Sequence, residues 1–226
     1  MVRIILGLSC AALVSGCSAL PEESRERQSV SASSPSRTLP APRTGSAAQC
    51  LTSLGSAGAH FSPLPDRYID QGCTNLNTVQ LASLSSDSQS LAVTNLGPVT
   101  CEVSQVFAGW ARFGVDRAAR QILGSPIRSI ETMGSYSCRN VAGSGRRSAH
   151  STGEAIDVSG FVLEDGRRVT VRVGWNGGTE REREFLRVVQ QSACKRFGTV
   201  LGPDYNAAHY DHLHVEGVIA TKSYCR

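Results

Sequence analysis

The stretch His209-Tyr210-Asp211-His212-Leu213-His214 lies close to the end of the 226 residues and holds three of the chain's five histidines. Read as a β-strand, it places His212 and His214 on one face, because side chains alternate between the two faces of a strand. Leu213 and Val215 then lie on the opposite face. Two imidazoles side by side on a pleated surface, with an apolar face behind them, are typical of a metal site on a sheet.

A zinc ion in a protein takes about four ligands at roughly 2.0–2.2 Å for nitrogen or oxygen, so one strand cannot complete a site. A fourth histidine lies in Ser148-Ala149-His150-Ser151-Thr152-Gly153-Glu154-Ala155-Ile156-Asp157. Seven extended residue steps would separate His150 from Asp157 by about 23 Å, and a helix by about 10 Å. Both side chains reach one ion only if the chain folds back, and Gly153 can take the positive φ that a tight bend needs. The spacing therefore predicts His150 in a loop and Asp157 on the following strand.

These two motifs resemble the S-x-H-x-x-G-x-A-x-D and H-x-H signatures of the LAS metallopeptidases. That group comprises lysostaphin-type enzymes, D-Ala-D-Ala peptidases and the Hedgehog signalling domain. More narrowly, the chain from residue 50 to 226 resembles the bacterial extensin-like C-terminal domain family. The segments that carry this narrower resemblance are residues 135–139, 148–157, 159–161, 197–206 and 224–226.

The resemblance implies a bound Zn²⁺ with His150, Asp157 and His214 as its protein ligands. Three protein ligands leave a fourth position for water, which is the mark of a catalytic rather than a structural zinc site. Zinc would lower the pKa of that water to about 7 and polarise a scissile carbonyl. The resemblance further implies His212 as the general base. It implies His209 as a residue that stabilises the oxyanion or transfers protons.

Several neighbouring residues receive weaker assignments. Arg139 is a candidate for holding a substrate carboxylate or the oxyanion, and a salt bridge within the fold is the alternative. Asp211 faces away from the histidines if the strand is regular, which favours a supporting or structural role. Ser148 is expected to brace the loop, and Glu154 is expected to face solvent.

The function implied by the resemblance is a zinc-dependent hydrolase of an amide bond in peptidoglycan peptides. Whether it acts as an endopeptidase or a carboxypeptidase stays open. The alternative is a non-catalytic, zinc-containing cell-wall binding module, because the Hedgehog relatives keep the metal site on a domain without enzymatic activity. The expected fold is Hedgehog/DD-peptidase-like.

The N-terminal segment predicts export and lipidation. Residues 4–14 form an apolar run after a short basic start, which is the length of a signal-peptide core and too short to span a bilayer. Val14-Ser15-Gly16-Cys17 resembles a bacterial lipobox, so we expect a signal peptide over 1–16 and lipid on Cys17; an ordinary secretory signal is the alternative. Residues 17–49 are rich in Ser, Pro, Ala and Arg and predict a flexible linker. The expected location is the periplasmic side of the envelope, anchored in the outer membrane.

Cysteine usage agrees with export. Without Cys10 and Cys17, six cysteines remain, none in close C-x-x-C spacing, so we expect three disulfides rather than a cysteine-ligated zinc. The sequence does not choose among the fifteen possible pairings. The six cysteines are Cys50, Cys73, Cys101, Cys138, Cys194 and Cys225.

The charge of the chain argues against nucleic-acid binding. The net charge is only +4, and no clustered basic face of the kind that nucleic-acid binders carry is evident. We expect a monomer.

The periodicity of the domain from residue 50 onward predicts an α+β fold, with flanking helices on an antiparallel sheet that disulfides hold together. Residues 51–98 give a weak pattern and are expected to form short helices and loops. A hairpin is expected from strands 155–163 and 168–173, because Glu164-Asp165-Gly166 is a turn sequence. The remaining predictions are a helix over 99–123, a strand over 126–132, a loop over 175–178, a helix over 179–197 ended by Gly198, and a strand over 199–201.

Overall fold

A ten-stranded, mostly antiparallel sheet forms the centre of the protein in the computed structural model, which describes residues 43–226. Its strands follow the order β1-β4-β5-β7-β8-β11-β10-β12, while β6 also pairs with β4 and β9 with β8. Among the strands of residues 43–226, the parallel pairs are β5–β7 and β10–β12. The strands are β1 (His60–Pro63), β4 (Thr78–Ser85), β5 (Ser90–Thr94), β6 (Pro98–Thr100), β7 (Ile127–Gly134), β8 (Ala155–Leu163), β9 (Arg168–Thr170), β10 (Phe197–Leu201), β11 (Leu213–Val218) and β12 (Tyr224–Cys225).

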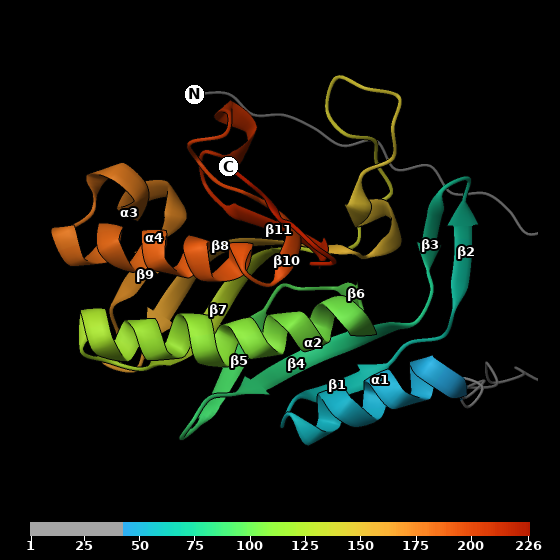
Figure 1. Ribbon diagram of the computed structural model, residues 1–226, viewed down its shortest axis with the longest axis horizontal. Coiled ribbons are helices and arrows are strands. Elements are labelled where there is room, and N and C mark those ends of the chain that lie inside the picture. Colours follow the sequence, from blue (N-terminus) through green and yellow to red (C-terminus); the bar gives the residue numbers. More distant parts are fainter. Residues whose placement is uncertain (1–42) are drawn as a thin grey trace, which may run out of the picture. The chain divides into compact units, whose positions relative to one another are not determined.

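Helices pack on one side of this sheet, with α2 and α4 running across it and α1 beside β1 (Figure 1). A separate hairpin of β2 (Arg67–Asp70) and β3 (Cys73–Asn75) projects beyond β6 (Figure 1). The helices are α1 (Gly45–Ser56), α2 (Cys101–Trp110), its π-helical continuations η1 (Ala111–Asp116) and η2 (Ala119–Leu123), α3 (Val171–Gly177), α4 (Glu180–Cys194), and the 3₁₀ turns η3 (Ala149–Thr152) and η4 (Ala207–His209). The predicted α+β class is confirmed.

The hydrophobic core lies between these helices and the sheet. Trp110 on α2 is fully buried, and its indole Nε1 donates a hydrogen bond to the Val189 carbonyl of α4 at 3.0 Å. Its ring packs edge-to-face against Phe161 of β8 and Phe197 of β10, with centroids 6.3 and 6.1 Å away. The helix predicted over residues 99–123 is confirmed from residue 101 onward, while residues 99 and 100 belong to β6.

Three disulfides tie the periphery to this core, which confirms the expected number. They join Cys50 to Cys101, Cys73 to Cys138 and Cys194 to Cys225. The first links α1 to the start of α2, the second links the β2–β3 hairpin to the segment after β7, and the third links the end of α4 to β12.

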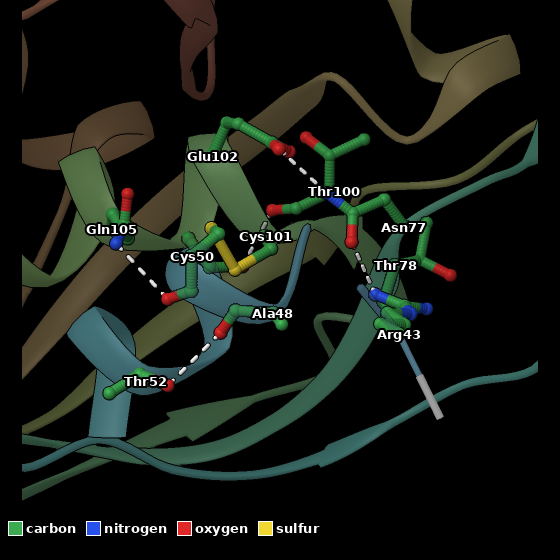
Figure 2. Close-up of a disulfide and its surroundings, with 11 residues drawn as sticks. Arg43, Ala48, Cys50, Thr52, Asn77, Thr78, Thr100, Cys101, Glu102 and Gln105 are labelled. Carbon is green, nitrogen blue, oxygen red and sulfur yellow. Dashed lines mark hydrogen bonds between the residues drawn. A yellow bond between two sulfur atoms is a disulfide. The ribbon is translucent and has the colours of Figure 1, made fainter. Parts of the chain in front are cut away.

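The first helix of the domain lies earlier than the sequence predicted. Helix α1 begins at Gly45, so the segment interpreted as linker overlaps this helix over residues 45–49. Arg43 anchors the chain ahead of the helix, because its guanidinium donates to Asn77 Oδ1 at 2.6 Å and to the Leu64 carbonyl at 2.7 Å. Figure 2 shows Arg43 and Asn77 beside the disulfide that holds α1. The predicted signal peptide and Cys17 lie outside the described residues.

Residues 51–98 form mainly strands, where the sequence predicted short helices and loops. Strand β5 alternates fully, with Leu91 and Val93 buried between exposed neighbours. This is the pattern of a strand with one face on a core.

Two helix–strand boundaries also differ from prediction. The strand expected over 168–173 ends at Thr170, which caps α3 by accepting a hydrogen bond from Val173 N, and Val173 is consequently exposed. Trp175, expected in a loop, lies in α3 and is buried. Helix α4 begins as predicted, with a capping box formed by Thr179 and Glu182.

Helix α4 is shorter than predicted. It ends at Cys194, so Phe197 and Gly198 belong to β10 and glycine is not the residue that ends the helix. Phe197 is buried in the core from the strand rather than from the helix. Within residues 43–226, no helix combines the length and the apolar character that a membrane crossing requires.

Candidate metal centre

The turn that carries His150 is built by its neighbours. Ser148 begins the 3₁₀ turn η3, and its side chain accepts a hydrogen bond from His150 N. The turn ends at Gly153 with φ +69°, a left-handed conformation that reverses the chain into β8. A Cβ at Gly153 would lie 3.3 Å from the Pro98 carbonyl, so the tight packing against β6 also favours glycine. The predicted bend and the bracing role of Ser148 are confirmed.

Strand pairing brings Asp157 opposite His214. In the antiparallel pair of β8 and β11, these two residues are direct cross-strand neighbours. Alternation directs the adjacent residues, Val158 on β8 and Val215 on β11, into the hydrophobic core. Asp157 and His214 therefore lie on the sheet face opposite the core, as expected for a site that rests on the sheet.

His150, Asp157 and His214 converge on one point. His150 Nε2 lies 3.2 Å from His214 Nδ1 and 3.2 Å from Asp157 Oδ2, while His214 Nδ1 lies 2.9 Å from Asp157 Oδ1. Ligands at about 2.0–2.1 Å from a tetrahedral zinc are separated from one another by about 3.3 Å. The three separations are close to this value, so the residues fit a tetrahedral metal ion with one further position.

In both histidines of the cluster, one ring nitrogen donates a hydrogen bond to an acceptor that lies away from the point where the three side chains converge. His150 Nδ1 donates to the Ser135 carbonyl at 2.5 Å, and His214 Nε2 donates to Glu216 Oε2 at 3.1 Å. Carbonyl and carboxylate oxygens only accept, so these nitrogens carry the protons. The other nitrogens, His150 Nε2 and His214 Nδ1, are thereby directed at the common point.

His212 lies beside this trio rather than within it. Its Nε2 is 3.5 Å from Asp157 Oδ1, and its Nδ1 donates to Asp211 Oδ1 at 2.9 Å. The strand predicted to start at 209 begins only at Leu213, so Asp211 does not alternate to the far face. It contacts His212 directly, which agrees with the expected supporting role.

His209 approaches from η4. Its ring centroid lies 5.1 Å from that of His212, and its Nδ1 donates to Asn206 Oδ1 at 2.7 Å. Asn206 Oδ1 also accepts from Ala208 N, which identifies this atom as the oxygen and gives His209 its Nδ1–H tautomer. Burial, followed by the charges of His212 and His214, lowers the pKa of His209 to about 4.

The electrostatics of the trio suit a cation. Burial raises the pKa of the Asp157 carboxyl, but hydrogen bonds to His150 and His214 outweigh it and hold that pKa well below its usual range. Burial lowers the pKa of His214, whereas its hydrogen bonds to Asp157 and Glu216 raise it, to about 9 on balance. The hydrogen bond to His214 lowers the pKa of Glu216. Two ionised carboxylates therefore face this group of imidazoles.

A pocket of about 580 Å³ opens over the cluster. Asp157, His209, His212 and His214 line it, together with Arg139. Arg139 is exposed and makes no ion pair within residues 43–226, which argues against the salt-bridge alternative considered for it. Further lining residues come from the segment 139–148, from β10, η4 and β12, and from the loop before η4.

Glu216 is the residue at this site that the sequence analysis missed. It follows His214 by two positions on β11, so the same alternation that pairs His212 with His214 would have placed it on this face. Glu154, by contrast, is exposed as expected. A second group of metal-type residues, Asp70 with Cys73 and Cys138, is no alternative site, because the two cysteines form a disulfide.

The fold and the site define a disulfide-linked α+β domain with a His–Asp–His cluster at the floor of a pocket. Residues 48–226 match the family described as extensin-like protein C-terminus, and the chain belongs to this family. No curated protein and no solved structure matches the chain significantly.

Proposed function

We propose that this protein is a zinc-dependent hydrolase that cleaves an amide bond in the peptide part of peptidoglycan. The observation that carries the proposal is the convergence of His150 Nε2, Asp157 and His214 Nδ1, 2.9–3.2 Å apart, at the floor of an open pocket. The resemblance of both motifs to the LAS metallopeptidases supports the hydrolytic chemistry. A Hedgehog/DD-peptidase-like relationship of the fold belongs to the same proposal.

His150, Asp157 and His214 would hold the zinc ion. Bound there, zinc supplies Lewis-acid polarisation of a carbonyl and makes a water molecule acidic near neutral pH. Three protein ligands leave room for that chemistry, as in catalytic rather than structural zinc sites. The donor set of two imidazoles and one carboxylate is also one that zinc accepts.

His212 is the proposed general base. Because its Nδ1–H donates to Asp211, its Nε2 has a free lone pair that lies on the pocket side, 3.5 Å from Asp157 Oδ1. It can accept a proton from the attacking water, and the Asp211 carboxylate stabilises the imidazolium that results. His212 is buried and Asp211 is partly buried, which strengthens this ion pair relative to one in water.

His209 and Arg139 complete the proposed machinery. In its Nδ1–H tautomer, His209 presents Nε2 as an acceptor, which suits the relay of protons away from His212 better than hydrogen-bond donation to an oxyanion. Arg139, on the pocket wall, is placed to attract a carboxylate of the substrate. Stem peptides of peptidoglycan carry such groups.

The cellular setting is part of the proposal. The three disulfides support folding in an oxidising compartment. Together with the lipobox-like sequence ending at Cys17, they support a lipid-anchored protein on the periplasmic side of the envelope, in the outer membrane. Peptidoglycan is the amide-containing polymer within reach of that location.

The test is digestion of purified peptidoglycan by the purified full-length protein, followed by mass spectrometry of the released peptides. We expect fragments with new amino and carboxyl ends, their loss with a chelator, and their return on adding zinc. Asp157→Asn, which keeps the side-chain size but weakens the ligand, serves as the matched inactive variant. Zinc-loaded protein that binds peptidoglycan and releases no fragment would instead identify a non-catalytic binding module.

A further inference from the structure

Glu216 contacts the candidate metal centre from outside. Strand β11 places it two residues after His214 on the same face, and its Oε2 accepts the Nε2–H of His214 at 3.1 Å. The two nitrogens of an imidazole are separated by one ring carbon, and their in-plane bonding directions diverge widely. Glu216 is therefore on the far side of the ring from His214 Nδ1, which points at His150 and Asp157. This position excludes Glu216 from the ligand set.

We propose that Glu216 is a positioning residue that sets the affinity of this centre for zinc. The inference rests on the proposed zinc site. By accepting the Nε2 proton, Glu216 leaves Nδ1 as the ring nitrogen that faces Asp157 and the common point, where a metal ion would displace the proton that Nδ1 otherwise donates to Asp157 Oδ1 at 2.9 Å. It also holds the ring in the plane that directs Nδ1 at the common point.

The carboxylate adds a charge effect to this hydrogen bond. Asp157 alone leaves a site with Zn²⁺ carrying one excess positive charge, and the nearby Glu216 carboxylate balances it. Glu216 is only partly exposed, so solvent screens this interaction incompletely. Both effects favour the metal-bound state.

His150 has an equivalent acceptor, but it is the backbone carbonyl of Ser135. A backbone group cannot be removed by substitution. Of the two outer acceptors on the histidine ligands, only Glu216 is open to a direct mutational test. Loss of such an acceptor typically weakens metal affinity by about 10–100-fold.

Two variants separate the hydrogen bond from the charge. Glu216→Gln keeps an oxygen that can accept from Nε2–H and removes only the charge, whereas Glu216→Leu removes both at similar size. The control is Glu164→Gln, which makes the same charge change. Glu164 is exposed at the end of β8, about 23 Å along the strand from Asp157.

Zinc affinity is measured on the metal-free full-length chain by competition with a chromophoric chelator, and the melting temperature of each metal-free form is recorded beside it. We expect Glu216→Leu to bind zinc about 10–100-fold more weakly than the wild type. Glu216→Gln should fall between the two, and Glu164→Gln should equal the wild type. The melting temperatures of the metal-free forms should change little.

Two outcomes would overturn the inference about Glu216 without refuting the proposed zinc site. One is a wild type that binds zinc while Glu216→Leu binds it within twofold of the same affinity. The other is unchanged zinc affinity in Glu216→Gln together with complete loss of hydrolysis, which would make Glu216 a catalytic group. A wild type that binds no zinc refutes the proposed centre itself, and with it the function.

Discussion

His212→Ala should separate zinc binding from hydrolysis. The side chain is buried beside the centre, but its Nε2 is 3.5 Å from Asp157 Oδ1 and it is absent from the converging trio. Replacing it with alanine removes the proposed base and leaves His150, Asp157 and His214 in place. Zinc content should therefore stay at about one ion per chain, by the three-ligand reasoning.

The loss of activity can be bounded. General acid–base catalysis typically contributes about 10²–10⁴-fold, which is about 2.7–5.4 kcal/mol in activation free energy. Because a base acts in the transition state, kcat and kcat/KM should fall together. Asp211→Asn keeps an acceptor for His212 Nδ1–H and loses only the charge, so its loss should be smaller.

His212→Ala should lower the free energy of unfolding, but by less than its total value. Removing the imidazole leaves Asp211 without its partner, which costs about 1–3 kcal/mol when the group is buried. The Asp211 side chain is 21 % exposed, so water replaces part of that interaction and the lower end applies. The variant should remain folded at 25 °C.

The assay combines zinc analysis of dialysed protein with initial rates on a peptidoglycan peptide that the wild type cleaves. Loss of zinc from His212→Ala would show that the ligand within the His-x-His pair has been misassigned. Full zinc content with full activity would place the base elsewhere, with His209 and Asp211 next in line. Either result refutes the reasoning.

Two further predictions concern the ligands and the disulfides. Asp157→Ala and His214→Ala should each lose most of the zinc measured in the wild type, and full occupancy in both variants would contradict the ligand assignment. The Cys50–Cys101 bond spans a sequence separation of 51 residues, for which chain entropy gives about 4 kcal/mol of stabilisation. Replacing both cysteines with alanine should lower the free energy of unfolding by about that amount in urea titrations; a change below about 1 kcal/mol would argue against this treatment.

Much of the site could be predicted from the two motifs. The fold-back between His150 and Asp157 follows from distance alone, and the need for ligands from a second segment follows from zinc's coordination number. The register that places Asp157 directly opposite His214 does not follow from the motifs. Strand pairing between residues this far apart in the sequence depends on the whole sheet. The supporting carbonyl of Ser135 left no signal, because any residue type offers a carbonyl.

Two errors came from assuming regular strands. Asp211 was placed on the far face because the strand was extended back to residue 209, whereas Asn206 caps a 3₁₀ turn and pairing starts at Leu213. The alternation of Val169, Val171 and Val173 predicted a longer strand over a segment where the Thr170 cap begins a helix instead. Short apolar runs are compatible with both the two-residue period of a strand and the 3.6-residue period of a helix. Here the local capping hydrogen bond favours the helix.

The strands within residues 51–98 were missed for a different reason. Ser90–Thr94 alternates as a strand should, but frequent Gly, Ser and Pro around it obscured the pattern. Glu216 lies outside the two motifs, which end at His214. Continuing the two-residue period by one step would have included it.

The segment 139–147 is anchored at its base and exposed at its tip. The Cys73–Cys138 bond fixes one end to the β2–β3 hairpin, Ser148 N donates to the Arg139 carbonyl at 3.1 Å, and Arg147 donates to the Gln71 carbonyl at 2.8 Å. Residues 142–146 at the tip are exposed, yet two of them line the pocket. Substitutions there, apart from Gly143 with its left-handed φ of +74°, should change stability by about 0.5 kcal/mol or less, as exposed positions usually do. Evolution can therefore reshape one wall of the pocket without changing the proposed metal ligands or the core, so that the selectivity of the pocket and the ability to fold depend on separate stretches of the chain.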